Sequence, residues 1–119
     1  MTRALAIFTV RHGACLVRVR LLPTVRDVDA AYREGKRRRG GKWVHSFFVQ
    51  SVSPVARHVG TIVLPADGRI AELVPHEVDN AVTHHQVSIH RDDDEPHATA
   101  VGLLTARIFA GLKRLGMEV

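Results

Sequence analysis

Two apolar segments near the start of the chain predict a β-hairpin. Residues 5–10 and 14–22 are rich in aliphatic and β-branched side chains, and Gly13 stands in the short polar stretch between them. Within the second segment apolar residues alternate with arginines, namely Val17, Val19 and Leu21 with Arg18 and Arg20. Because successive side chains of a strand point to opposite faces, one face of this strand should be buried and the other should meet solvent.

The remaining pattern predicts three helices and two further strands. Apolar residues at helical spacing predict a helix over 24–34, a second over 70–86 and a last one from near Glu95. Segments rich in aromatic and β-branched residues predict strands over 43–52 and 58–64. Asp94 is expected to cap that last helix and Pro96 to stand in its first turn, whereas Pro75 fits a helix only in the first turn or at a kink. This order predicts an α+β fold with an antiparallel or mixed sheet.

Length and composition indicate one ordinary domain over residues 1–119. A chain of 119 residues can close one hydrophobic core, and 45% hydrophobic with 24% charged residues is typical of folded proteins. Cys15 is the only cysteine, so no internal disulfide is expected, and its apolar neighbours favour a buried thiol. The apolar run near the start is too short to cross a membrane, and because nothing suggests an oxidising compartment we expect a cytoplasmic protein.

The sharpest chemical signal is His76-Glu77-Val78-Asp79-Asn80 on the predicted helix 70–86. Zinc peptidases of the His-Glu-x-x-His class place two imidazoles one helical turn apart, so that both reach one zinc ion, and the glutamate activates a metal-bound water. This motif, followed by Asp94-Glu95-Pro96-His97 at the start of a later helix, resembles the small zincin-like metallopeptidase domains, including short ones encoded by phages and prophages.

The resemblance implies a zinc site formed by the two closing helices. In such a site Glu77 is the general base, His76 and Glu95 are metal ligands, and His97 is a substitute for Glu95. The family has its second histidine at the place of Asn80, and a carboxamide oxygen is a poor zinc ligand. The resemblance therefore implies weak zinc binding and a degenerate hydrolase that is weak or inactive.

Other side chains offer a rearranged metal site. His84 lies eight residues after His76, about 12 Å along a helix, so the two cannot share one ion. Asp79 lies three residues after His76 on a neighbouring part of the same helix face. It could chelate zinc beside His76, with Glu95 or His97 completing a set of three ligands.

A basic segment is interpreted either as a site of phosphate contacts or as a solvated loop. The net charge is +5, and five cations lie in one short stretch: Lys36, Arg37, Arg38, Arg39 and Lys42. Such a segment suits phosphate contacts that read no sequence, and Trp43 either stacks on a base or, as we expect, packs in the core. The alternatives are a non-enzymatic phage or mobile-element accessory protein that binds and inhibits a host protein, and a nonspecific nucleic-acid binder. We expect a protein partner, because no nucleic-acid recognition motif is present.

Overall fold

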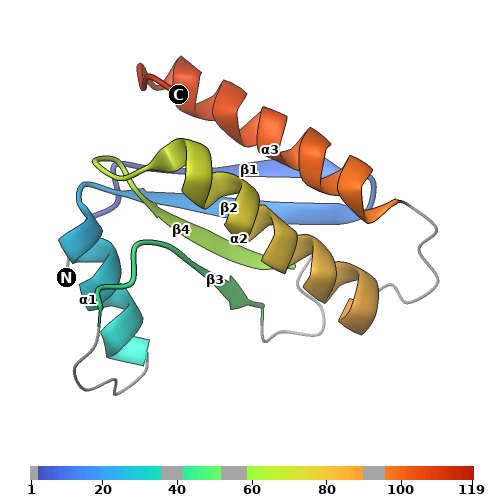
Figure 1. Ribbon diagram of the computed structural model, residues 1–119, viewed down its shortest axis with the longest axis horizontal. Helices are drawn as coiled ribbons and strands as arrows, with labels where there is room; N and C mark the ends of the chain where they lie inside the picture. The colour runs from blue at the N-terminus through green and yellow to red at the C-terminus, as the bar shows by residue number, and fades with distance from the viewer. Residues whose placement is uncertain (1–2, 36–41, 52–58, 90–95) are drawn as a thin grey trace.

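The computed structural model describes residues 3–35, 42–51, 59–89 and 96–119 (Figure 1). In this part of the chain the elements are β1 (Ala6–His12), β2 (Cys15–Leu22), α1 (Val25–Gly35), β3 (Phe47–Gln50), β4 (Gly60–Pro65), α2 (Ile70–His84), the π-helical turn η1 (His85–Ile89) and α3 (His97–Arg114). The strands and α-helices follow one another as predicted, and the π-helical turn is an addition that the pattern did not predict. The fold is α+β.

The four strands form one mixed sheet in the order β1-β2-β4-β3. β1 with β2 and β3 with β4 are antiparallel pairs, whereas β2 and β4 are parallel. His12 pairs with Cys15, so the first hairpin turns through the two residues between them, Gly13 and Ala14. Gly13 has a φ of 58°. A positive φ at the first central residue alone is typical of a type II′ turn, which explains the glycine at this place. The predicted hairpin is confirmed.

The two faces of the sheet are covered unequally. α2 and α3 pack on one face, where Val17, Val19 and Leu21 of β2 are fully buried. On the opposite face α1 packs through Val28 in a small separate cluster, and Figure 1 shows this helix near one end of the strands. The alternation predicted for β2 is confirmed, and its outward side is covered by α1 only in part.

Helix α2 lies on the sheet through a stripe of buried apolar residues, namely Ile70, Val74, Val78, Ala81 and Val82. Pro75 lies inside the helix, beyond its first turn, and because proline has no N–H group the helical hydrogen bond to the carbonyl of Ala71 is missing. Helix α3 begins at His97, and Pro96 is its N-cap residue without a side-chain capping bond. The expectation that Pro96 stands in the first turn is therefore wrong, and Asp94 and Glu95 lie outside the described residues.

The expectation that Trp43 packs in the core is wrong, since this residue is 52% exposed. Strand β3 starts only at Phe47, whose ring centroid lies 5.3 Å from that of Tyr32 in α1 in an edge-to-face arrangement. The amide of Val44 donates to Oδ1 of Asp29 at 2.9 Å, which ties the segment before β3 to α1. Phe47, not Trp43, is thus the aromatic anchor of this region.

Gly60, the first residue of β4, is required by the close approach of β3. A Cβ atom at this position would lie 2.2 Å from the carbonyl oxygen of Val49 and 2.7 Å from the ring of Phe48. Backbone cannot yield as a flexible side chain can, so any larger residue must separate the two strands. Gly102 in α3 is the opposite case, because a Cβ atom there would meet nothing within 4 Å.

We therefore predict opposite effects of two Gly→Ala substitutions. Gly60→Ala should lower the free energy of unfolding by about 1–3 kcal/mol, since it overpacks the β3–β4 contact. Gly102→Ala should raise it by roughly 0.5–1 kcal/mol, since alanine loses less backbone entropy in a helix. Urea unfolding of both variants measures the two changes, and equal effects would contradict the close approach of β3 to Gly60.

Candidate functional site

The centre of the candidate site is the carboxyl group of Glu77 in α2. Its side chain is only 3% exposed. Ser46 Oγ, in the segment before β3, donates to Oε2 at 2.5 Å, and Asn80 Nδ2, one helical turn further along α2, donates to Oε1 at 3.1 Å. Each carboxyl oxygen thus accepts a hydrogen bond, which offsets the cost of burying the group.

This geometry limits the chemistry that Glu77 can perform. A general base must reach the proton that it abstracts, either directly or through one water. A carboxylate has about four acceptor sites, so two remain in principle, but burial leaves little room for water to reach them. Glu77 therefore links the helix to the edge of the sheet rather than facing open solvent.

A groove of about 400 Å³ lies beside this hydrogen-bonded group. It runs between strand β3 and the end of α2 with η1, and its lining residues are Phe48, Gln50, Asn80, Thr83, His84 and Val87. Two of these lining residues, Phe48 and His84, form a ring contact with centroids 6.0 Å apart. Asn80 belongs to both features, because its amide bonds Glu77 and its side chain lines the groove.

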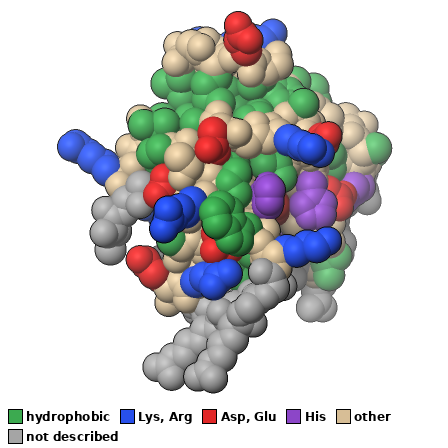
Figure 2. Space-filling view, turned by 60° about the vertical axis from the view of Figure 1, so that its left-hand side comes forward, with side chains coloured by type: hydrophobic (Ala, Val, Ile, Leu, Met, Phe, Trp, Pro, Cys, Tyr) green, Lys and Arg blue, Asp and Glu red, His purple; other side chains and the backbone are tan. Residues whose placement is uncertain are grey.

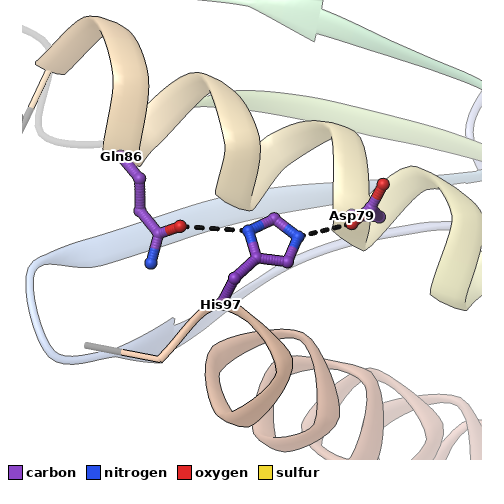
Figure 3. A network of polar contacts seen from close by, with 3 residues as sticks. All are labelled: Asp79, Gln86 and His97. Atoms are coloured by element: carbon purple, nitrogen blue, oxygen red, sulfur yellow. Dashed lines mark hydrogen bonds and ion pairs between the residues drawn. The ribbon is translucent and has the colours of Figure 1, made fainter. Parts of the chain in front are cut away.

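A second polar cluster joins the start of α3 to α2 (Figure 3). His97 Nε2 lies 2.5 Å from Oδ1 of Asp79, and its Nδ1 lies 3.0 Å from Oε1 of Gln86 in η1. The side chains of Asp79 and His97 are 56% and 41% exposed, so this contact contributes little stability. Its effect is positional, because it aligns the first turn of α3 with the last turns of α2.

Among the described residues, two of the predicted zinc ligands are brought into contact. Asp79 and His97 are in contact, whereas His76 is an exposed residue of α2 and Glu95 lies outside the described residues. Within the described ranges, no group of three or more His, Cys, Asp or Glu side chains is arranged to hold a metal ion. The predicted ligand pair His76 and Glu95 and the three-ligand alternatives with Glu95 thus remain predictions.

The basic segment can be assessed only at its end. Lys36, Arg37, Arg38 and Arg39 lie outside the described residues, and Lys42 is exposed. Figure 2 brings the end of the molecule with α1 forward and shows its Lys and Arg side chains interspersed with Asp and Glu, with His side chains beside hydrophobic ones. The described cations on this side therefore do not form one continuous basic patch.

Sequence reasoning missed Ser46 and Gln86 as partners of the predicted site residues. Ser46 lies 31 residues before Glu77, and no local pattern marks it. Gln86 is the last residue of the predicted helix 70–86. It lies seven residues, or about two helical turns, after Asp79, and this spacing indicates that both side chains lie on one side of the helix. Only the position of α3 makes that neighbour His97.

Three comparisons with known proteins found no match to this chain: no protein-family model, no curated protein and no solved structure matches it. None of the helices in the described part combines the length and apolarity that crossing a membrane requires.

We predict that the two hydrogen bonds to Glu77 stabilise the fold. Ser46→Ala and Asn80→Ala should each lower the free energy of unfolding by about 1–3 kcal/mol, because each leaves a buried carboxyl oxygen without its donor. Ser51→Ala, which removes a hydroxyl from the other end of β3, should change it by less than about 0.5 kcal/mol. Chemical denaturation measures all three, and losses no larger than that of Ser51→Ala would exclude the proposed role of the donors.

Proposed function

We propose that this chain is a zincin-like, metallopeptidase-related protein whose hydrolytic site is degenerate. The supporting observation is that Glu77, the residue in the place of the general base, is buried with both carboxyl oxygens engaged by Ser46 and Asn80. Asn80 stands where the family has its second histidine, and its amide serves as a hydrogen-bond donor to Glu77. A carboxyl group used in this way supports packing of α2 rather than activation of a water.

The metal chemistry is testable with one substitution. We predict that the protein binds zinc weakly and that Asn80→His binds it at least about tenfold more tightly, since it supplies the missing imidazole one turn from His76. Isothermal titration with zinc measures both affinities, and Asn80→Gln is the matched control because it keeps a carboxamide. Equal affinities for Asn80→His and Asn80→Gln would contradict the zincin-like origin of the site.

A second function, the binding of a protein segment, is favoured by the groove beside β3. β3 is an edge strand of the sheet, and Val49 is one of its exposed apolar residues. An extended peptide can pair with the backbone of such an edge and send alternate side chains into a neighbouring groove. Phe48 and Thr83 line the groove from its two sides, so a bound segment would contact both the sheet and α2.

Peptide selection tests this second function. From a library of random extended decapeptides we expect binders whose affinity falls at least about tenfold in Thr83→Arg, because the long side chain fills the groove. Thr99→Arg adds the same charge on an exposed position of α3 and should leave affinity unchanged. Selected peptides that bind Thr83→Arg as tightly as the unchanged protein would exclude this groove as their site.

A further inference from the structure

The outward face of strands β1 and β2 carries a cluster of arginines. Residues that pair across the two strands share one face of the sheet, and these pairs are Ile7 with Arg20, Thr9 with Arg18, and Arg11 with Leu16. The alternate residues of β2, including Val19, point into the core beneath α2 and α3. We call Arg11, Arg18 and Arg20 the basic sheet face.

No described strand residue on this face is acidic. The strand residues that pair across this face are apolar, threonine or arginine. Within the described residues no ion pair or side-chain hydrogen bond involves Arg11, Arg18 or Arg20. Two acids of α1 have partners of their own, since Asp29 pairs with Arg33 at 2.7 Å and Asp27 accepts a hydrogen bond from Thr24. The three guanidinium groups are thus available to an external anion.

The rows of the sheet place hydroxyl groups beside the charges. Arg18 lies between Thr9 of β1 and Thr61 of β4 in one row across the three strands. Arg18 and Arg20 are two residues apart on β2, which separates them by roughly 7 Å along the strand, and neighbouring strands are about 4.8 Å apart. Arginine forks and threonine hydroxyls are the side chains that commonly bond phosphate oxygens, so the face suits a row of phosphates.

We propose that the basic sheet face binds the backbone of a single-stranded nucleic acid. Apolar side chains flank the arginines, because Ile7, the partner of Arg20, is 60% exposed and Leu5 is 61% exposed. A single strand has unstacked bases that can cover such side chains, whereas a duplex hides its bases between two backbones. Among the described helices, α1 packs on this side of the sheet against Leu22 and Val63 and not on the arginines, so the arginines are presented by strands rather than by a helix that could enter a major groove.

This proposal is independent of the zincin-like origin and of the peptide groove. The groove lies between β3 and α2, on the side of the sheet covered by the two long helices. It is also distinct from the segment Lys36 to Lys42, because the contact is made by strand residues in a fixed register. The binding reads no base sequence, since the phosphate contacts carry none.

Fluorescence anisotropy with a labelled 30-nucleotide single strand of mixed sequence tests the proposal. The triple variant Arg11→Ala, Arg18→Ala, Arg20→Ala should bind at least about tenfold more weakly and should lower the slope of log affinity against log salt by about 2, at ~0.7 per phosphate contact. The control, Arg69→Ala, Lys113→Ala, removes two positive charges from exposed positions at the start of α2 and on α3 and should keep the slope. A third variant, Arg37→Ala, Arg38→Ala, Arg39→Ala, measures how much the basic segment contributes to the same binding.

Each outcome supports or overturns the proposal. Loss of slope confined to the first triple variant supports it, as do amide shift changes at Thr9, Arg18 and Thr61 when the unchanged protein is titrated by NMR. Equal losses of slope in the first variant and the control show a general charge effect and overturn the proposal. A loss of slope confined to the third variant assigns binding to the basic segment and also overturns it. Tighter binding to a duplex of the same length, or equal binding to anionic vesicles, overturns the assignment to a single strand.

Discussion

The parallel pairing of β2 with β4 is the constraint on which the rest of the structure depends. It sets Val19 beside Ile62 and Leu21 beside Leu64, so the two central strands present one apolar surface to α2 and α3. A slip of β2 by one residue would turn Arg18 into this surface and bury an unpaired charge. Because β4 leads through a short turn into α2, the same pairing also determines where α2 crosses the sheet.

The position of α2 explains why a helix residue and a residue before β3 share one hydrogen-bonded group. α2 crosses close to the edge strand, so the segment that enters β3 passes the middle of the helix and Ser46 reaches Glu77. Asn80 completes the group from the next turn. In a metal-dependent hydrolase the same carboxyl group would have to face a metal-bound water, so its burial between helix and sheet agrees with the proposal of a degenerate site.

Two surfaces on opposite sides of the sheet offer different chemistry. The groove beside β3 combines aromatic, amide and hydroxyl groups, which suits a peptide. The basic sheet face combines guanidinium and hydroxyl groups with no acid among its strand residues, which suits phosphates. They are separated because β2 alternates apolar and basic residues, and this alternation sends the charges away from the two long helices. A ligand on one surface therefore need not displace a ligand on the other.

The sequence by itself determined the order of the elements, the first hairpin and the inward side of β2, because these depend on local spacing and on the period of the strand. It also located Glu77, Asp79 and His97 as polar residues of interest. Only the tertiary structure decided that Ser46 bonds Glu77 and that Asp79 meets His97, because the residues of each pair are far apart in sequence and are joined by the packing of helices on the sheet. For the same reason Trp43 proved exposed: local aromatic content predicts a buried strand residue, but the chain enters the sheet only at Phe47.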